Sequence, residues 1–157
     1  MENSNHFNVI VIGAGISGIG AGYYLKKNCP NKSFCIIEGR ENIGGTWDLF
    51  KYPGIRSDSD MFTLGYAFKP WKEQKTIANG PSILSYLEET VEENNLREKI
   101  KFSHNVLSAN WNSAERNWEV RAAHHEQVIL FTANFLFMGT GYYNYDEGYT
   151  PEFDDLD

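Results

Sequence analysis

The residues with the clearest capacity for chemistry are three glycines near the N-terminus and one acid that follows them. Gly13, Gly15 and Gly18 form a G-x-G-x-x-G pattern directly after the apolar residues 9–12. In a dinucleotide-binding turn, the first glycine permits the tight turn, the second lets the backbone approach a pyrophosphate, and the third lets the next helix pack closely on the strand. Glu38 lies twenty residues after Gly18, at the end of a second apolar run. This spacing predicts a site for the adenosine diphosphate half of a dinucleotide.

The acid at position 38 indicates which dinucleotide is bound. A carboxylate there accepts hydrogen bonds from ribose hydroxyls, whereas it would repel a 2′-phosphate. The free N–H groups at the start of the helix after the glycines would face the pyrophosphate. We therefore expect FAD or NAD at this site, and not NADP. A strand, turn and helix without a ligand is the plain alternative, because glycines also recur in structural turns.

The elements that must position these residues follow from the hydrophobic pattern. Strands at 9–12 and 34–37, with a helix at 19–27 between them, make a βαβ unit. Glycines and prolines interrupt the chain from 39 to 79, where we expect only a short helix at 61–68. Pro81 and the helical spacing of the apolar residues after it predict a helix at 81–94. The remaining segments predict strands at 100–104, 106–112, 117–123, 127–132 and 135–138.

The order of these elements predicts an α/β fold. We expect a Rossmann-like dinucleotide-binding domain in which an antiparallel β-meander is inserted into a parallel sheet. The last strand would return beside the first, so that the glycine turn at 139–141 lies at the same carboxyl edge as Gly13. Trp111 and Trp118 flank one turn and are expected to pair across it. A length of 157 residues suits one domain.

Composition narrows the possible partners and compartments. The net charge is −7, with four acids close to the C-terminus, so nucleic acid is not an expected partner. No apolar run of about 18 residues occurs, so we expect no transmembrane segment and a cytoplasmic protein. Cys35 is expected to be an inert core thiol, and the absence of a C-x-x-C pattern argues against a redox dithiol. Three histidines, His104, His124 and His125, lack ligand spacing, so no metal site is expected.

Two further motifs are more specific than the glycine fingerprint. With residues 44–48 (GGTWD), 52–60 (YPGIRSDSD) and 141–149 (GYYNYDEGY), the chain resembles the flavin-dependent Baeyer–Villiger monooxygenases over nearly its whole length. The resemblance implies FAD as the bound cofactor and NADPH and O2 as co-reactants. The implied reaction is oxygenation of a small ketone or of a sulfur-containing substrate, for which the flavin supplies the chemistry.

The resemblance also implies roles for individual residues. Gly45 lets the chain pass close to the FAD, and Thr46, Trp47 and Asp48 would line the cofactor. Val106 would meet the adenine through its backbone. The residues that would border the NADP site are Arg56, Ser57 and Asp58, of which Asp58 would also lie near the flavin and is the candidate catalytic residue. Asp48 could instead cap a turn, and Arg56 could instead form a surface ion pair with Asp58 or Asp60.

The chain departs from this family in length. The family carries a second glycine fingerprint for NADPH, and residues 1–157 end before one occurs. We therefore expect an incomplete N-terminal FAD-binding module that lacks the NADPH-binding domain and is inactive on its own. Two other interpretations stay open: another flavoprotein oxidoreductase, such as a disulfide reductase or an amine oxidase, and a truncated, non-catalytic FAD-binding remnant.

Overall fold

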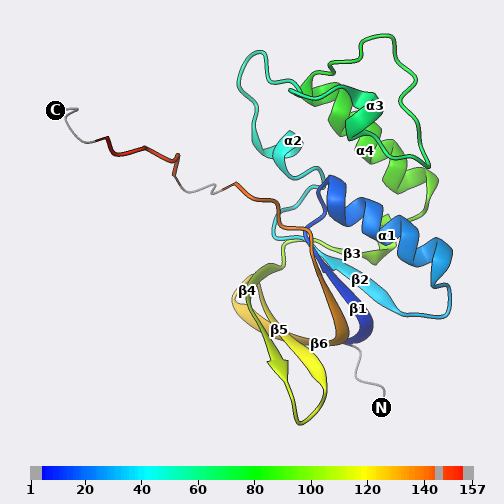
Figure 1. Cartoon of the computed structure of the whole chain (residues 1–157). Coiled ribbons are helices and arrows are strands. Elements are labelled where there is room, and N and C mark those ends of the chain that lie inside the picture. The colour runs from blue at the N-terminus through cyan, green and yellow to red at the C-terminus, as the bar shows by residue number, and fades with distance from the viewer. Residues whose placement is uncertain (1–4, 144–146, 154–157) are drawn as a thin grey trace.

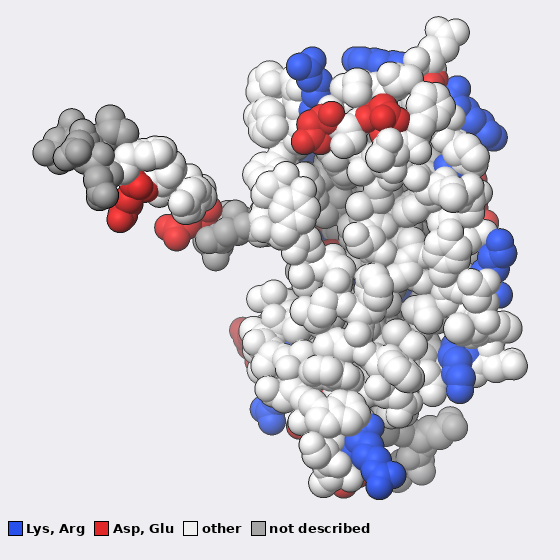
Figure 2. Space-filling model, viewed as in Figure 1, with Lys and Arg blue, Asp and Glu red and all other residues white. Residues whose placement is uncertain are grey.

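The computed structural model describes residues 5–143 and 147–153 of the chain (Figure 1). Asp154, Asp155 and Asp157, and part of the motif at 141–149, lie outside the described residues. A twisted sheet forms the centre, and the helices gather on one side of it. On the face of the molecule shown in Figure 2, basic and acidic side chains are scattered singly or in small groups around the margin.

The sheet has six strands in the order β3-β2-β1-β6-β5-β4. Strand β2 pairs in parallel with both β3 and β1, and β1 pairs in parallel with β6. Strand β5 pairs in antiparallel fashion with both β6 and β4. The sequence correctly predicted this mixed α/β sheet, including the return of the last strand beside the first. The strands are β1 (His6–Ile12), β2 (Phe34–Ile37), β3 (Ile100–Lys101), β4 (Asn105–Asn112), β5 (Asn117–His124) and β6 (Gln127–Met138).

The helices are α1 (Ile16–Asn28), α2 (Thr46–Leu49), α3 (Met61–Leu64), α4 (Gly80–Glu93) and the 3-10 turn η1 (Arg97–Lys99). Helix α4 matches the predicted range closely, because Asn79 caps its first turn and a proline stands in that turn. Helix α1 begins three residues earlier than predicted. Its first hydrogen bond runs from the Ile19 N–H to the Gly15 carbonyl, so the helix starts directly at the glycine turn. Among the described helices, none is both long and apolar enough to cross a bilayer.

Strand β6 corrects the prediction of two separate strands at 127–132 and 135–138. One continuous strand runs from Gln127 to Met138. Residues 127–133 pair with β5, and residues 132–138 pair with β1 on the other side. Because the two ranges overlap, the backbone stays extended through Ala133 and Asn134. The apolar pattern alone could not show this, because the polar residues Thr132 and Asn134 interrupt it between the two halves.

Two other predicted elements are shorter than expected. Helix α3 ends at Leu64 instead of residue 68, because the Gly65 N–H closes the turn and Tyr66 then forms a bridge with Lys69. Strand β3 ends at Lys101 instead of residue 104, because Ser103 adopts a positive φ of 57° that a strand cannot contain. Trp111 and Trp118 pair across their turn, as predicted, with ring centroids 5.7 Å apart.

The core has one cluster on each face of the sheet. The first cluster lies between the sheet and helices α1 and α4, and includes Val11, Ile36 and Leu87. The second lies on the opposite face, where the meander curls over β1 and β2, and includes Ile10 and Phe131. Both faces of β1 are therefore covered, which fixes the position of the glycine turn at its carboxyl end.

Candidate dinucleotide-binding site

A cavity of about 400 Å³ opens at the carboxyl edge of the parallel strands β1, β2 and β6. It is the place where ligands bind in open α/β sheets. Five separate segments converge on it, although they span most of the chain. Its lining includes Gly13, Gly15, Ser17, Glu38, Arg40, Gly45, Thr46, Trp47, His104, Val106 and Thr140.

Two of the three glycines of the fingerprint, Gly13 and Gly18, meet a steric demand that only glycine satisfies, whereas a Cβ on Gly15 would lie 3.6 Å from the Gly45 Cα, an ordinary contact distance. Gly13 has a φ of +95°, and a Cβ there would lie 2.6 Å from the Gly139 carbonyl oxygen. A Cβ on Gly18 would lie 1.8 Å from the Gly13 carbonyl oxygen, so this residue lets α1 pack against the turn. Gly18 accordingly lies behind the turn and does not line the cavity, whereas Gly13 and Gly15 do. The second glycine turn, at Gly139, stands directly against the first.

The Glu38 carboxylate is buried at the floor of the cavity, with 6% of the residue exposed. Its Oε2 accepts a hydrogen bond from the Ala14 N–H at 2.7 Å, and its Oε1 accepts one from the Arg40 N–H at 2.9 Å. Glu38 thus holds the glycine turn as well as lining the site. A carboxylate has about four acceptor positions, so two remain for ribose hydroxyls.

Arg40 is a site residue that the sequence analysis missed. Its Nη1 donates a hydrogen bond to the Gly45 carbonyl at 3.1 Å, and its Nε lies 3.8 Å from Glu38 Oε1. The guanidinium therefore joins the acid to the glycine loop that follows and places a positive charge at the cavity. Its position two residues after Glu38 was the available signal, although nothing in the sequence showed that it would turn back toward residue 45.

The loop at residues 44–47 closes over the first glycine turn. Gly44 and Gly45 have φ values of +115° and +57°, and the Gly44 N–H donates to the Ala14 carbonyl at 3.0 Å. A Cβ on Gly45 would lie 3.2 Å from the Gly15 Cα, so two backbones without side chains face each other across a narrow gap. Thr46 and Trp47 line the cavity. A side-chain-free cradle of this kind fits a pyrophosphate or ribityl chain.

Asp48, the next residue, lies outside the cavity lining. Its carboxylate is 3.9 Å from the Lys51 ammonium, and its backbone N–H donates to the Gly45 carbonyl. Asp48 therefore helps to form the short helix α2, in line with the alternative that it serves a turn.

Val106 and His104 form the far edge of the cavity, where β4 begins. The His104 Nδ1 lies 2.6 Å from the Phe102 carbonyl oxygen, and its ring stacks on His124 with centroids 4.1 Å apart. Burial, together with the neighbouring His124, Lys101 and His125, lowers the pKa of His104. The position of His104 at the cavity was not predicted from the sequence. In the part of the chain that the structure describes, no three His, Cys, Asp or Glu side chains gather into a metal-binding group.

The residues at 56–58 are not brought into the cavity. Ser57 is buried, its N–H donates to the Ala78 carbonyl at 2.9 Å, and its Oγ accepts from the Ser59 N–H. Arg56 and Asp58 are exposed on either side of it. Among the described residues no ion pair joins Arg56 to Asp58 or Asp60. Asp60 instead caps α3 by accepting hydrogen bonds from two backbone N–H groups.

Cys35 lies in the core beside the site, as predicted. Burial raises the pKa of its thiol to about 12, so the thiol stays protonated and unreactive at neutral pH.

The fold and the cavity together define a Rossmann-like dinucleotide-binding module. Residues 11–73 match the family model of the NAD(P)-binding Rossmann-like domain. This range contains the glycine turn, Glu38 and the loop at 44–47, and it is the part that surrounds most of the cavity.

Comparison with known proteins narrows this class. The chain is 53% identical over 154 residues to the FAD-containing monooxygenase EthA of Mycolicibacterium smegmatis, a match that covers 98% of the chain and 31% of that relative. It superimposes on an oxidized steroid monooxygenase bound to NADP with a TM-score of 0.81 and 29% identity, covering 96% of the chain and 29% of that structure. For OTEMO in complex with FAD and NADP the TM-score is 0.78 at 28% identity, covering 96% and 28%.

Over nearly its whole length the chain is thus similar to FAD-containing monooxygenases, and it spans about a third of the length of these relatives. The family resemblance drawn from the motifs at 44–60 is confirmed.

Proposed function

We propose that this chain binds FAD through the adenosine diphosphate half of the cofactor, and that it serves as the flavin-binding part of an NADPH- and O2-dependent monooxygenase. The observation that carries the proposal is the convergence of two glycine turns, a buried acid and the Gly44–Gly45 loop on one cavity. The relatives' names give FAD as their cofactor, and the solved structures hold NADP or both FAD and NADP.

Each part of the cavity has a role in binding. The remaining acceptor positions of Glu38 would bind the ribose hydroxyls, and the first turn of α1 would offer N–H groups to the pyrophosphate. The loop at 44–47, tied back by Arg40, would cover the pyrophosphate and place Trp47 toward the rest of the cofactor. Val106 would meet the adenine at the start of β4.

When FAD is bound, it supplies the redox chemistry that activates O2, while the protein positions and shields the cofactor. We propose a ketone or a sulfur-containing small molecule as the substrate of the monooxygenase. For Arg56, Ser57 and Asp58 we propose a role at the border of an NADP site outside the flavin cavity, with Asp58 the nearest of the three to the reacting groups. The exposure of Arg56 and Asp58 leaves these two side chains open to a partner surface, while the buried Ser57 holds the backbone between them.

Titration of the purified chain with FAD, FMN and ADP tests the proposal. Because the cavity addresses the adenosine diphosphate half, FAD should bind at least about tenfold more tightly than FMN, a difference of about 1.4 kcal/mol. ADP should compete with FAD. Equal affinity for FMN and FAD, or a failure of ADP to compete, would contradict the assignment of this cavity.

A further inference from the structure

The hydroxyl of Tyr66 reaches the first residue of α1 from a distant part of the chain. Tyr66 lies in the segment after α3, and its Oη donates a hydrogen bond to the Ile16 carbonyl at 2.6 Å. This carbonyl and the Ser17 N–H belong to the same peptide unit. Both Ile16 and Ser17 line the dinucleotide cavity. The Ser17 N–H lies in the first turn of α1, where the N–H groups have no partner within the helix.

We propose that Tyr66 is a positioning residue for the pyrophosphate of the bound dinucleotide. It fixes the orientation of the Ile16–Ser17 peptide and polarises it, so that the Ser17 N–H donates more strongly into the cavity. The inference rests on the proposed function, and it assigns a role to a residue that does not itself line the dinucleotide cavity.

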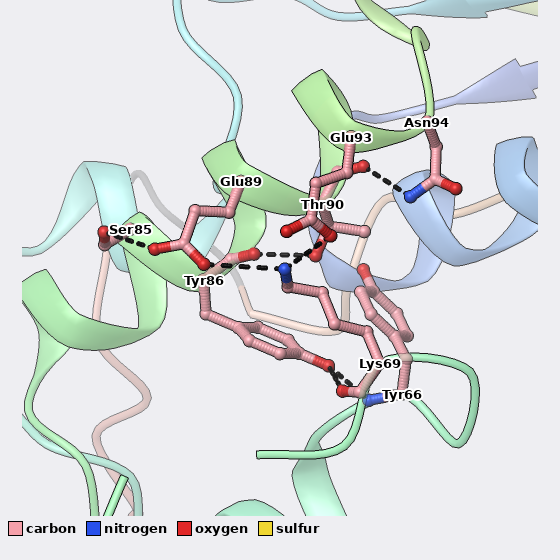
Figure 3. Close-up of polar contacts among 8 residues, drawn as sticks. All are labelled: Tyr66, Lys69, Ser85, Tyr86, Glu89, Thr90, Glu93 and Asn94. Atoms are coloured by element: carbon pink, nitrogen blue, oxygen red, sulfur yellow. Dashed lines mark hydrogen bonds and ion pairs between the residues drawn. The ribbon is translucent and has the colours of Figure 1, made fainter. Parts of the chain in front are cut away.

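Hydrogen bonds and ion pairs connect the segment of Tyr66 and Lys69 to α4, as Figure 3 shows. The Tyr66 N–H donates to the Tyr86 Oη at 2.7 Å, and that hydroxyl in turn donates to the Lys69 carbonyl at 2.6 Å. The Lys69 ammonium lies 2.6 Å from Glu93 and 3.5 Å from Glu89, both on α4. Because Tyr86 is buried, these contacts anchor the residues 66–69 to the helix. The Tyr66 side chain therefore starts from a fixed point.

The ring of Tyr66 is fixed as well. It stacks on Phe68 with centroids 4.7 Å apart and an interplanar angle of 11°. On the other side it lies against α1, where a Cβ on Gly20 would come within 3.0 Å of the Tyr66 Cε1. Burial raises the pKa of the Tyr66 hydroxyl, so the group keeps its proton and remains a donor at neutral pH. Gly20 thus provides the space that brings the hydroxyl within reach of Ile16.

A hydrogen bond to a carbonyl oxygen strengthens the N–H of the same peptide, because the two dipoles polarise each other. The effect is greatest for an anionic acceptor, since N–H bonds to phosphate are charge-assisted. Loss of the Tyr66 hydroxyl should therefore lower the affinity for ligands that carry phosphates and leave the affinity for a ligand without phosphate nearly unchanged. A purely structural role would weaken both kinds of ligand equally.

The test is the Tyr66→Phe variant, titrated with FAD, ADP and adenosine by calorimetry or by NMR. FAD and ADP should bind about three- to tenfold more weakly, the range for one hydrogen bond, while adenosine changes less than about twofold. The matched control is Tyr23→Phe. Tyr23 also stacks on Phe68, but its hydroxyl accepts a hydrogen bond from the Lys27 ammonium at 3.3 Å and, within residues 5–143 and 147–153, bonds no carbonyl of α1, so ADP affinity should stay unchanged.

Gly20→Ala provides a second variant, because the added methyl group displaces the Tyr66 ring and should cause the same selective loss of ADP affinity. Parallel losses for ADP and adenosine, or an unchanged ADP affinity in folded Tyr66→Phe, would overturn the role of Tyr66. A wild-type chain that binds neither FAD nor ADP would instead contradict the proposed function, and this result would be evident before any variant is compared.

Discussion

Two neighbouring loops carry the family-specific motifs, yet the structure uses them differently. The inner loop, residues 44–47, turns into the dinucleotide cavity and is fixed by backbone bonds and by two glycines with positive φ. The outer loop, residues 56–60, stays outside the cavity, and it exposes Arg56 and Asp58 while burying only Ser57. Of these two neighbouring loops, the inner one therefore builds the dinucleotide cavity, whereas the outer one exposes the charged side chains of Arg56 and Asp58 to solvent.

The comparison predicts very different costs for two glycine substitutions. Gly44→Ala would place a Cβ 2.5 Å from Leu84 Cδ1 at a φ of +115°, whereas Gly54, just before the outer loop, has a φ of +84° and open space around it. We expect Gly44→Ala to lower the free energy of unfolding by about 3 kcal/mol, from overpacking and backbone strain together. Gly54→Ala should cost about 1–2 kcal/mol, from the backbone alone. Urea denaturation of both variants measures the difference, and equal costs would show that the inner loop adapts.

Substitutions in the cavity and in the outer loop should also differ in their effect on FAD affinity. Glu38→Ala is expected to weaken FAD binding by about 1–3 kcal/mol, because it removes a charged acceptor for the ribose and loosens the glycine turn. Asp58→Ala should leave FAD affinity unchanged. Glu41→Ala, an exposed acid near the cavity, is the matched control for net charge. Calorimetric titration decides between these outcomes, and circular dichroism establishes that each variant is folded. An unchanged FAD affinity in Glu38→Ala would contradict the proposal that Glu38 binds the ribose of FAD.

The outer loop should matter for turnover, and hardly for stability. In this chain Asp58→Ala is expected to change the free energy of unfolding by less than about 0.5 kcal/mol, as for exposed sites. The corresponding substitution in the M. smegmatis relative should lower the rate of substrate oxygenation at least about tenfold, or about 1.4 kcal/mol in the barrier, if Asp58 borders the reacting groups. Product yield and NADPH consumption measured together would show this loss. Unchanged yield would leave Asp58 with only a structural role.

The smallest expected effect concerns the cap at the end of the outer loop. Hydrogen bonds from Thr63 and Phe62 lower the pKa of Asp60 below its ordinary value of 3.8. A lowered pKa in the folded state means that the stabilisation is complete above the ordinary pKa and is lost as the pH falls through the lowered value. Asp60→Ala should therefore lower the urea midpoint at pH 7, and the difference from wild type should shrink below about pH 3.8. Asp60→Asn, which still caps without titrating, should show no such pH dependence.

The sequence predicted the parts of the fold that local patterns determine. Strands β1 and β2 were predicted from apolar runs, and helix α4 from a proline and the helical spacing of the apolar residues after it. The continuity of β6 could not be predicted, because it depends on pairing with β1 on one side and β5 on the other. Local signals describe a segment, whereas strand length in a mixed sheet is set by its neighbours.

The same distinction holds for the candidate site. The glycines and Glu38 could be identified because spacing alone gives them a role. Arg40, His104 and Tyr66 could not, because each reaches its partner through a turn or a tertiary contact that no short pattern encodes. The roles expected for Arg56, Ser57 and Asp58 stay predictions.

The double pairing of β6 also constrains when the dinucleotide cavity can form during synthesis. His6 in β1 pairs with Thr132, which is 126 residues later, and the rim at Gly13 packs on Gly139. At about 5–20 residues per second, a ribosome needs roughly 6–25 s to add the residues between these two strands. Until then one edge of β1 has no partner, while β2 is already available on the other. The phosphate-binding turn of the nascent chain therefore stays incomplete for many seconds. A pause of the ribosome before residue 138 would lengthen the time for which the unpaired edge of β1 can pair wrongly.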